Sequence, residues 1–285
     1  MAALCLIHYR NKCPTQYSQA YKISSEEYNE PDFSYYKRNR AHLKKPSRAA
    51  EEKQNKFVEK CKDNFREKLG RNDRPNVKPF LLTVDPEKLA THKPTTHIKP
   101  YDVPFHLRQG FESELLNMLD AGILTPCDTP TAWNAKAFPV QTNSDPTKCR
   151  IIGDFRGLNR VLLKLYWHTE SSNQLLRHID PNAKVFCIID ATSRFHQCPV
   201  DPETSKLLTI VTNAGQFSYQ VLPHGVCNSS DLWNILTDGN SSIDSDLAIL
   251  KNMKFAQEKN LKLNPKRFFV SEQEEFGGST VSAEK

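Results

Sequence analysis

Residues 185–190 read Val-Phe-Cys-Ile-Ile-Asp, an apolar run that ends abruptly in a carboxylate. An uninterrupted run of this length is typical of a buried strand. Such a strand would present Asp190 at the end of its sheet, where a hard divalent cation binds carboxylate oxygens together with the phosphate oxygens of a substrate. The alternative interpretation is structural, because many aspartates at strand ends only cap a turn.

Around this run, short strands and helices follow one another without a regular order. Asn213-Ala-Gly215 lies between two apolar segments and is the signature of a β-hairpin. Apolar residues at helical spacing predict a helix that ends at Gly122 and another over 247–262. The predicted strands are 137–140, 149–152, 185–189, 207–211 and 217–222. Because hairpins and helices mix without β-α-β alternation, the sequence predicts an α+β fold.

Composition excludes several classes of protein. Of the 285 residues, 38% are hydrophobic and 25% are charged, which rules out collagen and a wholly disordered chain. No run approaches the ~18 consecutive apolar residues of a membrane helix, so we expect no membrane partner. The eight cysteines include no Cys-x-x-Cys pair and no zinc spacing, which indicates a reducing compartment. We expect a soluble intracellular protein, cytoplasmic or nuclear, of open oligomeric state.

Basic charge is concentrated in the first part of the chain. Residues 1–110 contain 22 Lys or Arg against 13 Asp or Glu, and 37–78 alone hold 15 basic and 6 acidic side chains. This asymmetry predicts a basic, partly helical or disordered N-terminal arm of unassigned function over 1–91, attached to a globular domain over 92–285. The charge either binds phosphates or forms a solvated surface.

Within the predicted arm, Phe57, Cys61 and Phe65 recur at every fourth position. This spacing predicts a helix with a thin apolar stripe that ends at Gly70. The prolines spaced through 72–104 predict an extended linker along the edge of the domain.

Two further segments offer groups that could hold a ligand. Leu222-Pro-His-Gly225 follows the predicted hairpin, and its glycine permits close approach of the backbone to a ligand, although an ordinary turn explains it equally well. Lys148-Cys-Arg-Ile-Ile-Gly-Asp-Phe-Arg-Gly-Leu-Asn159 places cations beside a strand. There Arg150 either grips a triphosphate or forms a surface salt bridge.

The order and spacing of these pieces are more informative than any one of them. Eight ordered segments carry a resemblance: Val103-Pro-Phe-His-Leu-Arg108, Glu114-Leu-Leu-Asn-Met-Leu-Asp-Ala-Gly-Ile-Leu-Thr-Pro126, Pro130-Thr-Ala-Trp-Asn134, Cys149-Arg-Ile-Ile-Gly-Asp-Phe-Arg-Gly-Leu-Asn159, Ile188-Ile-Asp-Ala-Thr-Ser-Arg-Phe-His-Gln197, Gly215-Gln-Phe-Ser-Tyr-Gln-Val-Leu-Pro-His-Gly225, Leu261-Lys-Leu-Asn-Pro-Lys266 and Val281-Ser-Ala-Glu284. Together they resemble the reverse transcriptase domain of gypsy-type LTR retrotransposon Pol polyproteins. The resemblance runs from about residue 92 to the C-terminus.

The resemblance implies a right-hand polymerase fold of fingers and palm, with an assigned role for each matching residue. Asp190 corresponds to the first catalytic aspartate, which ligates the metal ions, Mg²⁺ or Mn²⁺, of a two-metal phosphoryl transfer. Arg150 corresponds to the residue that contacts the incoming triphosphate, and Phe195 to the aromatic gate under its sugar. His224 and Gly225 fall in the loop that lines the nucleotide pocket.

The resemblance also implies contacts with an RNA or DNA template-primer, in addition to a dNTP. Trp133 falls near the template strand in the fingers, and Lys148 and Arg156 are the other nucleic-acid-binding candidates. By this resemblance the chain is an RNA-directed DNA polymerase, a nucleotidyltransferase, without the thumb and ribonuclease H regions of the family.

One departure from the family pattern concerns its second and third aspartates. The family carries them in an Asp-Asp hairpin, whereas this chain has no adjacent Asp-Asp pair and only 38 residues between Gly225 and Asn264. Two helices of ~12 residues and two strands of ~6 would already fill that interval. A deletion of the hairpin is the simplest account. The less favoured alternative is a remnant of the hairpin at 242–250, with Asp244 or Asp246 as a weak candidate for a surviving ligand.

We therefore expect a reverse-transcriptase-like domain whose catalysis is impaired, since one aspartate cannot hold two metal ions. Two alternatives remain. The chain could be a non-catalytic nucleic-acid-binding protein, or a non-functional retroelement relic.

Overall fold

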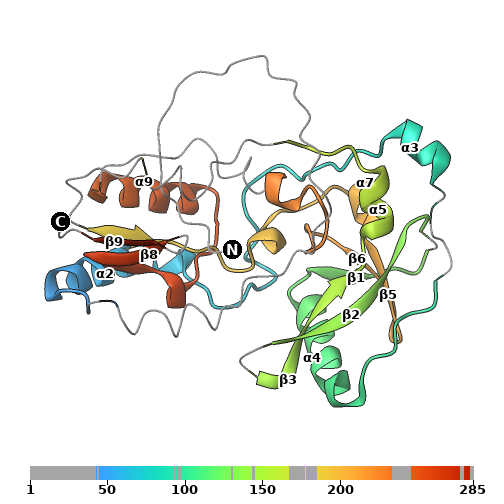
Figure 1. Cartoon of the computed structure of the whole chain (residues 1–285), viewed down its shortest axis with the longest axis horizontal. Coiled ribbons are helices and arrows are strands. Elements are labelled where there is room, and N and C mark those ends of the chain that lie inside the picture. The colour runs from blue at the N-terminus through green and yellow to red at the C-terminus, as the bar shows by residue number, and fades with distance from the viewer. Residues whose placement is uncertain are drawn as a thin grey trace.

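The computed structural model describes residues 43, 45–92, 94, 98–129, 131–142, 145–166, 177, 185–232, 245–276 and 279–282. These residues form two lobes, which lie on the right and the left of Figure 1. The right-hand lobe contains α3 (Pro86–Thr91), α4 (Arg108–Asp120), β1 (Leu124–Pro126), β2 (Asn134–Thr142), β3 (Asp145–Gly153), α5 (Arg156–Val161), α7 (Pro202–Leu207), β5 (Thr209–Thr212) and β6 (Gly215–Tyr219). The left-hand lobe contains α2 (Arg48–Lys60), β4 (Phe186–Ile188), α9 (Ser245–Glu258), β7 (Phe269–Ser271), β8 (Gln273–Phe276) and β9 (Ser279–Ser282).

The right-hand lobe is built on a five-stranded sheet with the order β1-β6-β5-β2-β3. Strand β2 runs parallel to β5, and all other neighbours in this sheet are antiparallel. The hairpin predicted around residues 213–215 is confirmed: β5 and β6 pair from Thr209↔Ser218 to Thr212↔Gly215. The strands predicted at 137–140 and 149–152 are also confirmed, since both lie within the longer β2 and β3.

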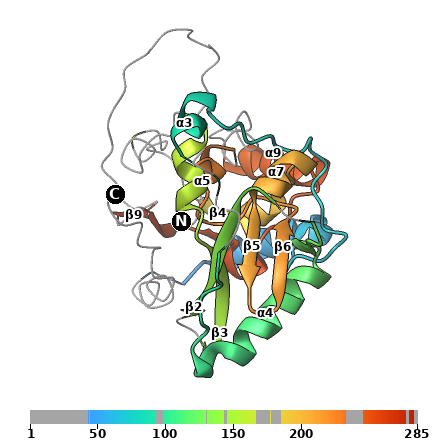
Figure 2. The same cartoon turned by 90° about the vertical axis from the view of Figure 1, so that its right-hand side faces the viewer.

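Helix α4 packs against the β3 side of the sheet and also contacts β1, along one side of the strands in Figure 2. It buries Phe111, Leu115 and Met118, which recur at helical spacing. The helix ends before Gly122, whose φ of 65° lies in the left-handed region that favours glycine. The predicted helix and its end are therefore confirmed.

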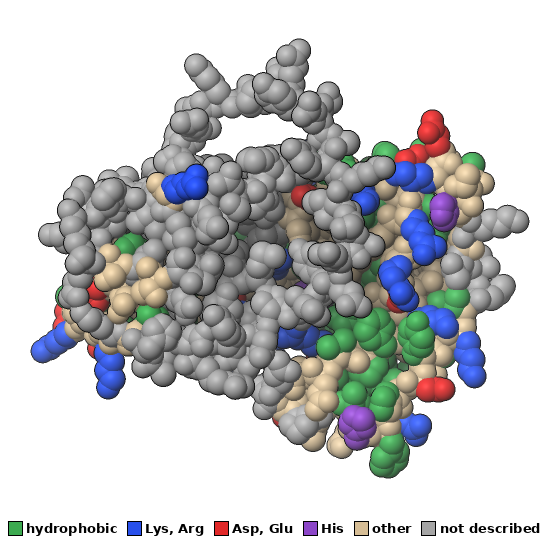
Figure 3. Space-filling model, in the orientation of Figure 1, with side chains coloured by type: hydrophobic (Ala, Val, Ile, Leu, Met, Phe, Trp, Pro, Cys, Tyr) green, Lys and Arg blue, Asp and Glu red, His purple; other side chains and the backbone are tan. Residues whose placement is uncertain are grey.

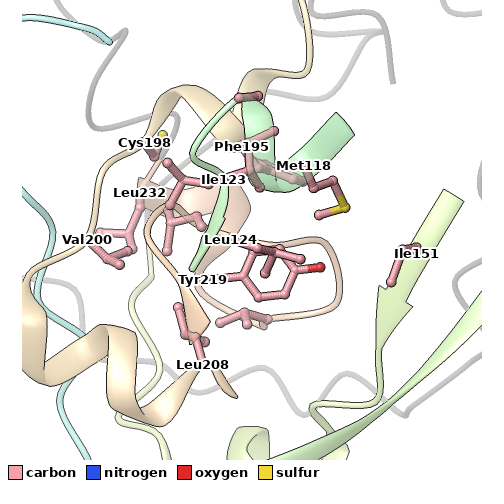
Figure 4. Close-up of a cluster of buried hydrophobic side chains, with 14 of the residues drawn as sticks. Met118, Ile123, Leu124, Ile151, Phe195, Cys198, Val200, Leu208, Tyr219 and Leu232 are labelled. Carbon is pink, nitrogen blue, oxygen red and sulfur yellow. The ribbon is translucent and has the colours of Figure 1, made fainter. Parts of the chain in front are cut away.

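A single hydrophobic core runs through the described residues. Figure 4 shows part of it, where side chains from α4, the five-stranded sheet and the segment before α7 meet around Tyr219. Tyr219, Leu208 and Leu124 are 1%, 0% and 1% exposed. Tight packing of such large side chains fixes the sheet against the segment that follows Asp190.

Strand β4 pairs antiparallel with β7 in the left-hand lobe, from Phe186↔Ser271 to Ile188↔Phe269. In Figure 1 this pair lies between α9 and α2, and β4 contacts α9 while β7 contacts α2. The strand predicted over 185–189 is thus confirmed. The prediction of a hairpin remnant at 242–250 is wrong for residues 245–250, because these form the first part of α9, whose main-chain hydrogen bonds run within the helix.

The segment before residue 92 belongs to the body of the protein as far as the structure describes it. Phe57, Cys61 and Phe65 are all buried in the common core, so the apolar stripe is confirmed. The helix itself ends at Lys60 and not at Gly70, and a 3-10 turn, Lys62–Asn64, follows it. Asn64 is buried and donates from Nδ2 to the carbonyls of Ala256 and Leu261, at 3.0 and 2.9 Å.

These contacts pack the described residues of 45–91 against the rest of the protein. Main-chain bridges join Phe80 to Val200 and Val84 to Leu162, so the proline-rich stretch follows the edge of the domain as predicted. The described residues before and after residue 91 therefore share one hydrophobic core, since their buried side chains pack together. Residues 1–42 lie outside the described part of the chain.

No helix within the described ranges is long and apolar enough to span a bilayer.

Candidate functional site

Asp190 lies two residues beyond the end of β4, where the sequence placed it. Its residue exposure is 7%, so the carboxylate is close to buried. Its carbonyl accepts a hydrogen bond from the backbone N–H of Asn264 at 2.8 Å. The end of β4 is therefore anchored to the segment that precedes β7, and the direction of the Asp190 side chain is fixed by this local pairing.

The carboxylate of Asp190 meets a guanidinium. Arg267 donates from Nη1 to Oδ2 of Asp190 at 2.8 Å, and the side chains of Arg267 and Asp190 are 33% and 9% exposed. Arg267 ends the 3-10 turn Pro265–Arg267, directly before β7, and β7 pairs with β4. The pairing of these two strands thus brings together two charges that are 77 residues apart.

The described residues do not fit a two-metal centre at Asp190. Such a centre needs several carboxylates to bridge the ions and offset their charge. Among the residues whose side chains are described, no three His, Cys, Asp or Glu residues gather in a group that could hold a metal ion. Asp244 lies outside the described residues, and the backbone of Asp246 lies in the first turn of α9, with its side chain outside the described part. The hydrogen-bond donor to the Asp190 carboxylate is the positively charged guanidinium of Arg267. Its charge would repel a metal ion bound to the same carboxylate.

Phe195 and His224 lie together, as the resemblance implied for two residues of a nucleotide pocket. Their ring centroids are 5.1 Å apart and the rings are tilted by 68°. Phe195 sits in the 3-10 turn Arg194–Gln197, which follows Ser193 in a left-handed conformation with φ of 45°. The guanidinium of Arg194 lies 4.4 Å from the centroid of the Phe195 ring, so a cation covers this ring.

His196 is a half-buried titratable group that the sequence did not single out. Its ring lies 5.7 Å from the ring of His224 and 6.4 Å from the ring of Tyr219. Burial lowers the pKa of His196 to about 3, and the nearby charges of His224 and Arg74 act in the same direction. His196 is therefore neutral over the physiological range, and its ring packs between the rings of Tyr219 and His224.

The loop at Gly225 is held by one side chain that the sequence analysis did not assign. Asn159 in α5 donates from Nδ2 to the carbonyl of Gly225 at 2.7 Å and accepts from the backbone N–H of Cys227 at 3.0 Å. Gly225 has φ of 90°, and a Cβ at this position would lie 3.3 Å from the carbonyl oxygen of Gly153. Asn159 is the last residue of the sequence segment 149–159. Its place at the end of that motif is the sequence feature that points to its role.

The segment 190–197 is joined to the segment 262–267 by buried hydrogen bonds. Gln197 is fully buried and donates from Nε2 to the carbonyls of Thr192 and Lys262, at 2.7 and 2.9 Å. It also accepts from the backbone N–H of Lys262 at 2.6 Å. Three bonds from one amide fix the loop that carries Asp190 and Phe195, and sequence reasoning missed this residue.

Arg150 and Lys148 both lie on β3, the edge strand of the five-stranded sheet. Arg150 is half-buried near Glu114 on α4, where burial raises the pKa of the Glu114 carboxyl and the charge of Arg150 acts against this rise. Lys148 is exposed and pairs with Asp145 at 3.1 Å. The roles of Arg150 as a triphosphate ligand and of Lys148 as a nucleic-acid ligand stay predictions.

Arg156 and Trp133 differ sharply in accessibility. Arg156 is exposed and forms two hydrogen bonds with Asp154, from Nε at 2.8 Å and from Nη2 at 2.7 Å. This pair lowers the pKa of Asp154 and raises that of Arg156. Trp133 is only 7% exposed and belongs to the core, so its ring is covered by protein and any effect on a template strand is indirect.

Comparison of the sequence with known proteins gives relatives among retroelement polyproteins. The chain is 24% identical over 147 residues to the Gag-Pol polyprotein of Walleye dermal sarcoma virus, covering 52% of this chain and 8% of that protein. It is 26% identical over 145 residues to a retrovirus-related Pol polyprotein from transposon opus of Drosophila melanogaster, covering 50% and 14%. No family model matches the chain. The chain therefore spans a small part of the length of these relatives.

Solved structures with a similar fold are reverse transcriptases. The prototype foamy virus protease-reverse transcriptase matches with a TM-score of 0.67 at 15% identity, over 87% of this chain and 35% of that one. The foamy viral protein in complex with an RNA/DNA hybrid also matches at 0.67 and 16% identity, over 92% and 37%. The chain thus has a reverse-transcriptase-like fold. More particularly, its sequence relatives make it a reverse-transcriptase-like domain related to retroviral and retrotransposon Pol, as the motifs predicted.

Proposed function

We propose that this chain binds a nucleic-acid duplex through its reverse-transcriptase-like surface and does not extend a primer. The observation that carries the proposal is a loop region in which the Phe195 and His224 rings pack together and Asn159 holds the exposed Gly225. Phe195 itself is buried, so contact with a ligand would come from His224 and the Gly225 loop. These are the positions to which the resemblance assigns nucleotide contacts. A neighbour of the same fold is described in complex with an RNA/DNA hybrid, which supports a hybrid as the first ligand to test.

Charge on the surface supports the same proposal. Figure 3 shows Lys and Arg side chains over the lobe that holds the five-stranded sheet, beside a patch of hydrophobic side chains. The side chains of Lys148 and Arg156 are 74% and 80% exposed, so both reach solvent. Cations of this kind bind phosphates by releasing counterions, which makes affinity fall as salt rises.

The absence of primer extension follows from the charges at Asp190. The resemblance implies Mg²⁺ or Mn²⁺ and a dNTP, but the described neighbour of the Asp190 carboxylate is the Arg267 guanidinium and not a further carboxylate. Among the described side chains, no set of carboxylates accompanies Asp190 that would hold the two metal ions of a phosphoryl transfer. Nucleic-acid binding needs no such set and can persist in its absence.

Binding and extension are measured separately. Fluorescence polarisation of a labelled RNA/DNA hybrid against the full chain, over a salt series, should give an affinity that falls steeply with salt. Replacing Lys148 and Arg156 by Gln should reduce the logarithmic salt slope by about 1 for each phosphate that the variant no longer neutralises. Lys206→Gln is the matched control, since Lys206 is also exposed and pairs with Glu203 on α7. Unchanged salt slopes in both test variants would contradict the assignment of this surface.

The proposed lack of catalysis is tested by primer extension on an RNA template with Mg²⁺ and with Mn²⁺. We expect no product above that of Asp190→Ala. Product from the parent chain that disappears in Asp190→Ala would show that a working metal centre exists and would overturn the proposal.

A further inference from the structure

The ion pair between Arg267 and Asp190 stands where the resemblance implies a metal centre. We propose that the guanidinium of Arg267 is the resident cation of this palm, which neutralises Asp190 in place of a divalent metal ion. The proposal does not depend on nucleic-acid binding, because it concerns the folded chain alone. It predicts that the protein folds, and keeps this part of its structure, without Mg²⁺ or Mn²⁺.

The burial of Asp190 requires a positive partner. Its side chain is 9% exposed, and an unpaired carboxylate with so little access to water is strongly destabilising. Arg267 supplies both a charge and a hydrogen bond, from Nη1 to Oδ2 at 2.8 Å. The arginine is itself 33% exposed, so it loses less hydration than the carboxylate does. One guanidinium therefore offsets the charge that a metal ion would otherwise offset.

The backbone around Arg267 is fixed on both sides, so this contact is built into the fold. The side chain of Asn264 accepts from the N–H of Lys266 at 3.0 Å, and the N–H of Arg267 donates to the carbonyl of Asn264, also at 3.0 Å. Phe268, the next residue, is 1% exposed, and its ring lies 5.3 Å from the ring of Phe65. A residue held between a capped turn and a buried aromatic has little freedom to move its Cα away.

The same geometry disfavours a metal ion. A divalent ion on the Asp190 carboxylate would lie close to the Arg267 guanidinium, and like charges at that separation repel. Among the described side chains there is no group of three potential ligands that could offset this repulsion. The guanidinium therefore pairs with the Asp190 carboxylate and also repels a metal ion that would compete for it.

A Mn²⁺ titration of the full chain, followed by electron paramagnetic resonance and thermal unfolding, tests the proposal directly. We expect the Tm to be the same within about 1 °C in EDTA and in millimolar Mn²⁺, since a ligand that does not bind the native state does not stabilise it. A Mn²⁺-induced rise in Tm that is abolished by Asp190→Asn would show that Asp190 binds metal, and would overturn the proposal.

A double-mutant cycle measures the pair itself. Asp190→Asn and Arg267→Gln should each raise the unfolding equilibrium constant. In the double variant the constant should rise by less than the product of the two single increases, by about 10-fold or more. Lys266→Gln is the matched control, because Lys266 pairs with Glu67 at 2.6 Å but is 72% exposed. If Arg267→Gln does not fold, Arg267→Met, which also removes the positive charge, carries the same cycle. Additive effects would overturn the proposal.

Discussion

A pH-dependent loss of stability is expected from His196, because desolvation of this half-buried histidine lowers its pKa from 6.5 to about 3. The folded state holds it neutral, whereas the unfolded state takes up a proton as pH falls below 6.5. The unfolded state therefore binds more protons over the interval from about 6.5 down to about 3, and linkage requires that stability falls with pH across it. The contribution is constant above 6.5, where both states are neutral.

The magnitude follows from the two pKa values. Each pH unit inside the interval costs about 1.4 kcal/mol, because one proton is bound by the unfolded state alone. Between about pH 8 and about pH 5 the sum is about 2 kcal/mol, which is a large share of the stability of an ordinary domain. His196→Phe removes the titrating group and keeps a ring beside Tyr219 and His224.

Urea unfolding at about pH 8 and at about pH 5 measures this contribution. The difference in unfolding free energy between the two pH values should be about 2 kcal/mol smaller in His196→Phe than in the parent chain. His106→Phe is the control for loss of a histidine, since His106 is exposed and lies in the 3-10 turn before α4. An equal pH difference in His196→Phe and the parent would refute the inference that a neutral, half-buried His196 contributes to acid sensitivity.

Three further substitutions test the packing of the site, each by urea unfolding. Asn159→Ala should cost about 0.5–1.5 kcal/mol, because it removes two solvent-exposed hydrogen bonds, to the carbonyl of Gly225 and from the N–H of Cys227. An unchanged unfolding midpoint would show that the loop is held otherwise. Gly225→Ala should cost about 1–3 kcal/mol, since its φ of 90° and the nearby Gly153 carbonyl oppose a Cβ; an unchanged midpoint would contradict this. Leu208→Ala should lower the free energy of unfolding by about 2–5 kcal/mol, because Leu208 is 0% exposed. Leu116→Ala is the control and should lower it by about 0.5 kcal/mol or less, because Leu116 is 61% exposed. Equal effects of the two changes would mean that the core is packed differently.

The elements of the right-hand lobe could be predicted from the sequence because their signals are local. Apolar periodicity defined α4 and its end at Gly122, and a two-residue turn defined the β5–β6 hairpin. The strand order could not be predicted in the same way. The parallel pairing of Asn134–Lys136 with Thr209–Val211 joins segments 75 residues apart and depends on which faces pack, not on any local pattern.

The N-terminal segment shows how composition misleads when few residues decide the packing. Its many exposed charges predicted an arm, and those charges do face solvent, as in the Arg48–Glu52 pair. Its position is set instead by Phe57 and Phe65, which enter the common core, and by the buried amide of Asn64. A charged helix with a thin stripe of large apolar side chains is therefore expected to pack against the protein body. This holds even where its net charge predicts a solvated segment.

The chemistry at Asp190 depends on a residue that no local pattern could associate with it. An aspartate after an apolar strand has the same sequence signature whether it faces metal ions or a guanidinium. The distinction is made by the β4–β7 pairing, which brings Arg267 to 2.8 Å from Asp190. In the proposal above, this guanidinium offsets the carboxylate charge that would otherwise attract a divalent ion. The strand-end aspartate thus predicts the strand correctly, while the proposed role of Arg267 depends on a long-range contact that the sequence pattern does not carry.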